Sequence, residues 1–396
     1  MPGRSIEACP IPLSSDTGNP TVALLTYLTT NHFDFGAIAK LGPEAARLGI
    51  TRPLIATDAG VRAAGLLDKV LEALGPVEAA VVYDETPGNP TERAVLAALA
   101  LYESEGCNGV ICLGGGSPMD LGKAVALLAR CAGPLAQYDP LAGGSGKATD
   151  IAPLIAIPTT SGTGSEVSLG FVIIMEDGRK LTFASPLFIP KVAICDPDLT
   201  LGLNTMLTAA TGMDAITHCI EAFLTPIVNP PAEGVALDGL RRGWRHIERA
   251  VADGSDREAR WEMMMASTEG AYAFVKGLGA VHAMSHAAGR IEALRLHHGT
   301  LNALFLPTVL RFNADACAEK YARLREAMGL SAGADLADAV AAMNQRIGMP
   351  SGLAALGVTA DHVPGIVEYA QKDLSARSNP KPANAHDYAS MVASTM

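Results

Sequence analysis

Short apolar runs alternate with helical patterns in the first half of the chain. The runs 53–57, 78–83 and 109–113 are rich in Val, Ile, Leu and Ala and have the length of buried strands. The stretches 91–105 and 119–131 repeat apolar residues with the period of a helix. Such alternation predicts an α/β fold with a parallel sheet that carries helices on both faces.

The strand pattern stops near residue 199, and long stretches rich in Ala, Leu and Met follow, such as 257–274 and 316–328. These have helical periodicity and predict an all-α second half. We place the boundary at 196–199. The expected organisation is a tail over 1–20 that is rich in Pro, Ser and Gly, a dinucleotide-binding α/β domain over 21–198 and a helical metal-binding domain over 199–396.

Composition narrows the function classes. The net charge of −11 argues against nucleic-acid or anionic membrane partners. No apolar run approaches the roughly 20 residues of a membrane helix, and the first residues lack the order of a signal peptide. The seven cysteines form no CxxC pair. This pattern is typical of reduced thiols, and we expect a cytoplasmic protein.

A glycine-rich loop, Gly114-Gly-Gly-Ser117, lies between an expected strand and an expected helix. Glycines let the backbone approach a ligand closely, and Ser117 can cap the helix with Pro118 at its first position. The free N–H groups of that helix start would then bind a phosphate. The alternative interpretation is a tight turn with no ligand.

A second polar loop, residues 157–166, follows the expected strand 152–157 and carries several hydroxyls and two glycines. Two such loops at the carboxyl ends of strands in one sheet are typical of a nucleotide site. Asp58 follows another strand. It is either an acceptor for the ribose hydroxyls of the cofactor, which would disfavour a 2′-phosphate, or simply a helix cap.

Polar residues with helical spacing mark the second half. Asp214 and His218 are four residues apart, and so are His282 and His286. On helices, each pair shares one face, so a carboxylate and several imidazoles can converge on one divalent metal. Five of the nine histidines fall within the two short segments 211–221 and 277–299, in apolar surroundings. Any one of them alone is more simply a satisfied polar residue, but burying the whole set without a ligand is costly.

Together these motifs resemble the iron-containing (group III) alcohol dehydrogenase family. The residues that carry the resemblance are Gly114–Asp120, Pro158–Glu166, Gly212–His218, His282–His286 and His298–Gly299, which occur in the family's order. The resemblance implies a dehydroquinate synthase-like fold, with an N-terminal nucleotide-binding α/β domain, a C-terminal helical domain and the active site between them.

The resemblance also implies the site residues. It implies that His286 lies near the nicotinamide as a catalytic proton relay. It implies Fe²⁺, with Zn²⁺ as the alternative, bound by Asp214, His218, His282 and His298. It implies that NAD is bound by Asp58, Gly114, Gly115, Gly116, Ser117, Asp120, Thr159, Thr160, Thr163, Lys180 and Leu199.

The chain departs from this pattern at one place. His282 and His298 are two residues further apart than the matching ligands of familiar relatives, so either His297 or His298 can be the fourth ligand. We choose His298, because the family's ligand directly precedes a glycine. The longer segment carries Arg290 and Arg295, which are either solvated or close to the substrate.

The expected activity is NAD-linked interconversion of a primary alcohol and its aldehyde. Within the family, stretches such as 84–91, 229–240 and 297–302 are most similar to bacterial 4-hydroxybutyrate dehydrogenases, which implies 4-hydroxybutyrate and succinic semialdehyde as substrates. Their carboxylate needs a cation or several N–H donors near the metal, and Lys276 and Arg290 are the candidate cations. The alternatives are a dehydrogenase for simple alcohols, a dehydroquinate synthase-like lyase and a non-catalytic binding protein. We also expect a homo-oligomer, namely a dimer.

Overall fold

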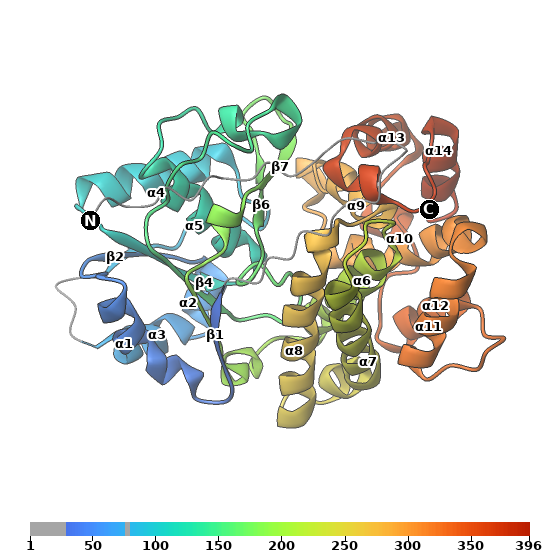
Figure 1. The fold of residues 1–396 in the computed structure, drawn as a ribbon, viewed down its shortest axis with the longest axis horizontal. Helices are drawn as coiled ribbons and strands as arrows, with labels where there is room; N and C mark the ends of the chain where they lie inside the picture. Colours follow the sequence, from blue (N-terminus) through green and yellow to red (C-terminus); the bar gives the residue numbers. More distant parts are fainter. Residues whose placement is uncertain (1–28, 76–79) are drawn as a thin grey trace.

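The structure is a computed structural model that describes residues 29–75 and 80–396. The expected tail over 1–20 and positions 78–79 of the expected strand 78–83 lie outside the described residues. The chain forms two halves that lie side by side, one built on a sheet and the other on helices (Figure 1). The predicted fold class is confirmed, as an α/β part that precedes a helical part.

The main sheet has six strands, and every neighbouring pair is parallel. Its central strands are buried along their whole length, as strands with both faces covered must be. In sheet order the strands are β1 (Thr30–Phe33), β8 (Val192–Cys195), β5 (Leu154–Pro158), β4 (Gly109–Gly114), β2 (Pro53–Ala56) and β3 (Val81–Tyr83).

Helices cover both faces of this sheet. One face packs α1 (Leu41–Arg47), α2 (Ala59–Ala63) and α3 (Leu66–Leu74) against Ile55 and its neighbours on other strands. The opposite face packs α4 (Glu92–Ser104) and α5 (Gly116–Leu128) against Leu54 and its neighbours. Leu54 and Ile55 are consecutive, and successive side chains of a strand point to opposite faces of the sheet. The two residues therefore belong to two separate hydrophobic cores.

An antiparallel hairpin, β6 (Gly170–Ile174) and β7 (Lys180–Ala184), interrupts the alternation and was not expected. It packs against α5, where the buried Lys123 ammonium donates hydrogen bonds to the carbonyls of Ser168 and Gly170. The hairpin lies on the side of the sheet half that faces the helices (Figure 1).

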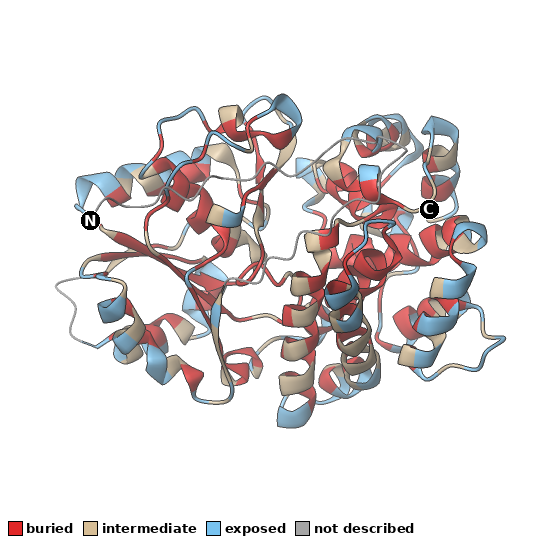
Figure 2. Cartoon of the chain, viewed as in Figure 1, coloured by how far each residue is buried: buried red, intermediate tan, exposed pale blue. Residues whose placement is uncertain are grey.

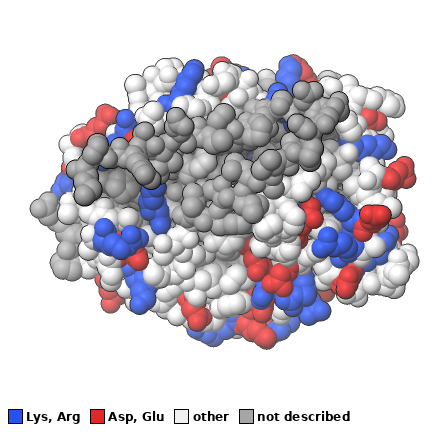
Figure 3. Space-filling view, viewed as in Figure 1, with Lys and Arg blue, Asp and Glu red and all other residues white. Residues whose placement is uncertain are grey.

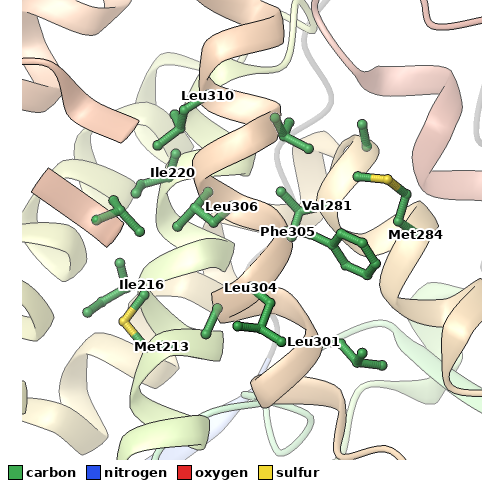
Figure 4. Packing of buried hydrophobic residues seen from close by; sticks show 14 of the residues in the cluster. Met213, Ile216, Ile220, Val281, Met284, Leu301, Leu304, Phe305, Leu306 and Leu310 are labelled. Carbon is green, nitrogen blue, oxygen red and sulfur yellow. The ribbon is translucent and has the colours of Figure 1, made fainter. Parts of the chain in front are cut away.

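The helical half is organised around α6 (Thr205–Leu224), whose residues are buried from Thr208 to its end (Figure 2). Apolar side chains of α6, α9 and α10 interdigitate to form its core (Figure 4). The helices that pack directly on α6 are α7 (Pro230–Ala252), α8 (Arg257–Ala273), α10 (His298–Asn313) and α11 (Ala318–Met328). The remaining helices join through α10 and through one another: α9 (Ala280–Ala288), α12 (Leu336–Arg346), α13 (Val363–Lys372) and α14 (Ala385–Ala393).

In the parts of the chain that the structure describes, no helix is both long and apolar enough to cross a membrane. On the face drawn in Figure 3, basic and acidic side chains are mixed and not gathered by sign.

Candidate active site

The centre of α6 carries Asp214 and His218, one turn apart and both buried. Nε2 of His218 lies 3.7 Å from Oδ1 of Asp214. Because α6 is apolar on nearly every side, these two polar groups are held without water around them. Burial lowers the pKa of His218 to about 4, so its imidazole is neutral at physiological pH.

His282 comes from α9 and is held by Glu221, also of α6. The Glu221 carboxylate lies 2.6 Å from Nδ1 of His282 and accepts a hydrogen bond from the backbone N–H of Val281. The adjacent N–H, of Ala280, donates to Oδ1 of Asn379. With Nδ1 bound in this way, Nε2 of His282 faces Asp214 at 3.8 Å. The carboxylate thus sets the ring orientation that a metal ligand needs.

His298 is the first residue of α10. Its Nε2 lies 3.6 Å from Oδ1 of Asp214, and its Nδ1 lies 2.9 Å from the Ser285 hydroxyl. Burial lowers its pKa well below the usual range. His297 is exposed and is the N-cap of the helix, so this geometry favours His298 as the fourth donor.

Asp214, His218 and His282 offer ligand atoms that all lie within 4.8 Å of one another, which suits a divalent metal, and Nε2 of His298 approaches the group from the Asp214 side. Ligands about 2.1 Å from an ion in a tetrahedral arrangement are about 3.4 Å from one another, close to the observed 3.6–3.8 Å. The Nδ2 of Asn302 lies among these donors, 2.6 Å from Oδ1 of Asp214, 3.2 Å from Nε2 of His282 and 3.1 Å from Nε2 of His298. Its own Oδ1 is buried without a hydrogen-bond partner among the described residues. Three imidazoles and a carboxylate are a donor set for first-row metals.

His286 lies one turn beyond His282, and its ring stacks on that of His298 with the ring centres 5.3 Å apart. Its Nδ1 is 2.9 Å from Oδ2 of Asp373, just after α13, and its ring lines a cleft of about 170 Å³. Burial alone would raise the pKa of the Asp373 carboxyl, but the charge and hydrogen bond of His286 lower it. Asp373 was missed from the sequence, because 87 residues separate it from His286 and no motif marks it.

The two cofactor loops lie side by side at the ends of β4 and β5. The N–H of Thr159 donates to the Gly114 carbonyl at 3.0 Å. A Cβ on Gly116 would lie 2.7 Å from the Thr163 side chain, and one on Gly115 would lie 3.3 Å from Oγ1 of Thr160. The absence of side chains at these two glycines therefore allows the first loop to pack closely against the second.

The expected helix cap at Ser117 is wrong. α5 already begins at Gly116, and its N-cap is Gly115. The Ser117 hydroxyl instead donates to the Gly88 carbonyl at 2.7 Å. The backbone turns directly from Gly114 into the helix, because Gly115 and Gly116 can pack against the second loop. The helix start therefore remains free of a side-chain cap, as a phosphate site requires.

The remaining expected cofactor residues fall into two groups. Asp58 caps α2 by accepting from the N–H of Val61, and Lys180 lines the cleft beside His286, where it donates to Asn89 at 3.0 Å. Burial lowers the pKa of Lys180 to about 8. Leu199 is buried and Asp120 is half-buried.

The side chains of Asp120 and Leu199 contact other parts of the protein. Both carboxylate oxygens of Asp120 accept hydrogen bonds, one from the Ser165 hydroxyl and the other from the Val172 N–H. The side chain of Leu199 packs into the core against the sheet. Direct cofactor contact by these two therefore remains a prediction, and the structure shows them ordering the second loop and the core.

The two candidate cations for a substrate carboxylate lie in different surroundings. Lys276 is wrong as a candidate, because its side chain is fully buried and forms an ion pair with Glu233 at 2.7 Å. Arg290 lines the cleft together with His286 and Lys180. Arg295 is exposed, in agreement with a solvated side chain.

The comparisons with known families cover nearly the whole chain. Residues 29–197 match the family described as iron-containing alcohol dehydrogenase. Residues 208–396 match the C-terminal part of the Fe-containing alcohol dehydrogenase family.

Individual relatives match at full length. A 4-hydroxybutyrate dehydrogenase of Cupriavidus necator is 54% identical over 383 residues, which are 95% of this chain and 100% of the relative. A 1,3-propanediol dehydrogenase of Klebsiella pneumoniae is 36% identical over 93% of this chain and 98% of its own length. Among solved structures, a 1,3-propanediol oxidoreductase superposes with a TM-score of 0.88 at 35% identity, over 94% of this chain and 100% of that one.

Proposed function

The chain belongs to the iron-containing alcohol dehydrogenase family, and from this premise we propose that it interconverts 4-hydroxybutyrate and succinic semialdehyde. Membership makes the protein an NAD-linked, metal-dependent oxidoreductase of alcohols and aldehydes. The observation that carries the proposal is the convergence of Asp214, His218, His282 and His298 beside the cleft that His286 lines. The 54% identical relative supports this particular substrate.

The protein holds the reacting groups in place. When bound, the metal supplies Lewis-acid stabilisation of the substrate oxygen, and NAD carries the hydride. Asp214, His218, His282 and His298 would hold the metal. The loops at Gly114–Ser117 and Thr159–Thr163, with Lys180, would hold the dinucleotide at the carboxyl ends of β4 and β5.

His286 is placed to move the alcohol proton toward solvent. It borders the cleft, and Asp373 binds its Nδ1 and so leaves Nε2 for the proton that the substrate releases. The Asp373 carboxylate also stabilises the imidazolium that forms when Nε2 accepts this proton. We propose the same pair, in reverse, for aldehyde reduction.

Simple alcohols are the second candidate substrate class, supported by relatives named for 1,3-propanediol. A lyase of the dehydroquinate synthase type would need a phosphorylated sugar-acid site, and the apolar surroundings of α9 disfavour it. The discriminating feature is the preference for a substrate with a distal carboxylate.

We further propose how the chain is organised and where it acts. The nucleotide-binding domain would run over 21–198 and the helical domain over 199–396. We propose a homodimer in the cytoplasm, with metabolites and not macromolecules as ligands. Light scattering at several protein concentrations tests the dimer, and a constant monomer mass would overturn it.

A substrate panel tests the proposed function. Purified protein of known metal content is assayed with NAD and 4-hydroxybutyrate, 1-butanol or 1,3-propanediol. We expect kcat/KM for 4-hydroxybutyrate to exceed that for 1-butanol by at least about tenfold, since one charge-assisted contact contributes about that much. Equal values for the acid and the plain alcohol would reject 4-hydroxybutyrate as the substrate and leave the simple-alcohol function.

A further inference from the structure

We propose that Arg290 binds the distal carboxylate of the substrate at the end of the cleft that begins at His286. The inference rests on the proposed function and adds to it the residue that selects an ω-hydroxy acid over a plain alcohol. It was not available from the sequence, which offered Lys276 equally, and the structure separates the two cations by their surroundings.

The guanidinium of Arg290 is fixed from two sides. Its Nε and Nη2 both donate to the Gly178 carbonyl, at 2.8 and 2.7 Å. Its Cζ lies 3.1 Å from the centre of the Tyr369 ring, which covers one face of the plane. Because these two contacts come from the β6–β7 turn and from α13, the group is held rigidly, and little side-chain entropy remains to be lost when it binds a ligand.

These contacts leave one edge of the guanidinium unused. The Nε–Nη2 edge is taken by Gly178, whereas Nη1 has no hydrogen bond or ion pair among the described residues. The remaining edge, formed by Nη1 and the second N–H of Nη2, is the fork that binds both oxygens of a carboxylate. A half-buried arginine with a free fork in a cleft indicates an anionic ligand.

The position of Arg290 suits a short hydroxy acid. Arg290 follows His286 by four residues, a rise of about 6 Å if the helical path of α9 continues. A four-carbon hydroxy acid has three C–C bonds of about 1.5 Å each between its end carbons, plus an oxygen at either end. One end of such a molecule can therefore lie near His286 while the other reaches the guanidinium.

The charges around the cleft favour an anion at this place. Besides Arg290, the cations Arg179, Lys180 and Lys372 line it, against the acids Asp139 and Asp373. Asp373 is bound to His286, Arg179 pairs with Asp177, and Lys372 pairs with Glu368. Arg290 and Lys180 are then the lining cations for which no ion pair is found among the described residues, and in a chain with a net charge of −11 their presence at one cleft favours an anion there.

The competing anion is a phosphate of the dinucleotide, because Lys180, an expected dinucleotide-binding residue, lines the same cleft. We favour the carboxylate, because the glycine loop and the second hydroxyl loop already provide phosphate donors at the sheet. The two sources give different kinetic signatures. Loss of a carboxylate contact changes the selectivity between substrates, whereas loss of a phosphate contact raises the KM for NAD with every substrate.

The test compares the metal-loaded native enzyme with Arg290→Gln and with Arg295→Gln, a matched control that removes the other arginine of the same segment. The readouts are the ratio of kcat/KM for 4-hydroxybutyrate to that for 1-butanol, the KM for NAD, and the Kd of butyrate measured by calorimetry in the presence of NAD. Butyrate carries the carboxylate without the hydroxyl, so its binding reports the subsite independently of turnover.

We expect Arg290→Gln to lower the selectivity ratio roughly ten- to hundredfold and to weaken butyrate binding by a similar factor. Arg295→Gln should change neither. Arg290→Lys should restore part of the loss, since it keeps the charge but not the fork. An unchanged ratio and butyrate Kd in Arg290→Gln would overturn the proposal, and so would a raised KM for NAD with an unchanged ratio.

The same experiment separates this proposal from the proposed function. If the native enzyme shows no preference for 4-hydroxybutyrate while butyrate binding still depends on Arg290, the substrate is wrong and the carboxylate subsite stands. If the native enzyme prefers 4-hydroxybutyrate and Arg290→Gln keeps that preference, the function stands and the subsite is wrong.

Discussion

Glu221 fixes both the orientation of His282 and the start of the helix that carries it. Its two oxygens accept from Nδ1 of His282 and from the N–H of Val281. The N-cap of α9 is Gly279, which has no side chain to offer, so this buried carboxylate acts as a cap from another helix. Glu221 thereby links the orientation of the His282 ring to the formation of α9, the helix that carries it.

The adjacent histidines give the first prediction. His298→Ala should lower the metal affinity more than tenfold, because even partners outside the ligand set cost that much. His297→Ala should change it little, since its ring is exposed. Elemental analysis after dialysis against a weak chelator measures both variants. The reverse order would show that His297 is the ligand.

The second prediction concerns Asp58. Asp58→Asn keeps the cap on α2 but removes the negative charge, so the helix should be preserved. If Asp58 faces the ribose of the cofactor, the ratio of kcat/KM for NADP to that for NAD should rise on the order of tenfold, about 1.4 kcal/mol. Steady-state kinetics with both cofactors measure it. An unchanged ratio would leave Asp58 as a helix cap alone.

At this scale, spacing in the sequence predicts only local pairs. The four-residue interval between Asp214 and His218 places both on one face of α6, and the structure keeps them together. Asp373, the partner of His286, lies far along the chain, and Asn302 lies on the same helix as His298. No periodicity in the sequence marks either residue. Tertiary packing decides such contacts, and the expectation for Lys276 failed for the same reason.

The sequence predicts helices and strands best where a single hydrophobic pattern determines them. The buried strands 53–57 and 109–113 appear as β2 and β4, because a continuous apolar run fits a strand covered on both faces. The hairpin β6–β7 and the early start of α5 were not predicted. Both depend on packing against neighbouring elements: the hairpin on the buried Lys123 of α5, and the helix start on the loop that contains Thr160 and Thr163.

The contact between α5 and β4 gives the third prediction. A Cβ on Gly122 would lie 2.2 Å from Sγ of Cys112, so Gly122→Ala should destabilise the protein by about 1–3 kcal/mol. The control is Gly234→Ala in the exposed part of α7, where nothing lies within 4 Å of the new atom. It should stabilise by about 0.5–1 kcal/mol. Urea denaturation compares them, and equal effects would contradict the packing argument.

On the scale of the whole molecule, the two halves contribute different groups to one reaction. The sheet supplies backbone loops at the ends of its strands, whereas the helices supply the metal donors from α6, α9 and α10. Arg290 joins them by its hydrogen bonds to Gly178 of the hairpin. The cleft that results is lined by residues of both halves.

This division gives the fourth prediction. Removing the metal should destabilise the helical half selectively, because its ligands tie three helices together, whereas the sheet holds none. Metal at a thousandfold excess over its Kd contributes about 4 kcal/mol. Hydrogen exchange measured by mass spectrometry should show lost protection in α6, α9 and α10 and little change in β4 and β5. Uniform loss over both halves would contradict it.

The contacts of Asn379 and Asp373 have a consequence for the order of events during synthesis. The four metal donors are complete at residue 298, yet the N–H of Ala280 and the ring of His286 are held by residues near the C-terminus. The ribosome synthesises the chain from its N-terminus, so every ligand residue is made well before Asp373 and Asn379. We expect iron to be acquired only after translation ends, and a nonsense mutation a few codons beyond His298 to yield a metal-free product.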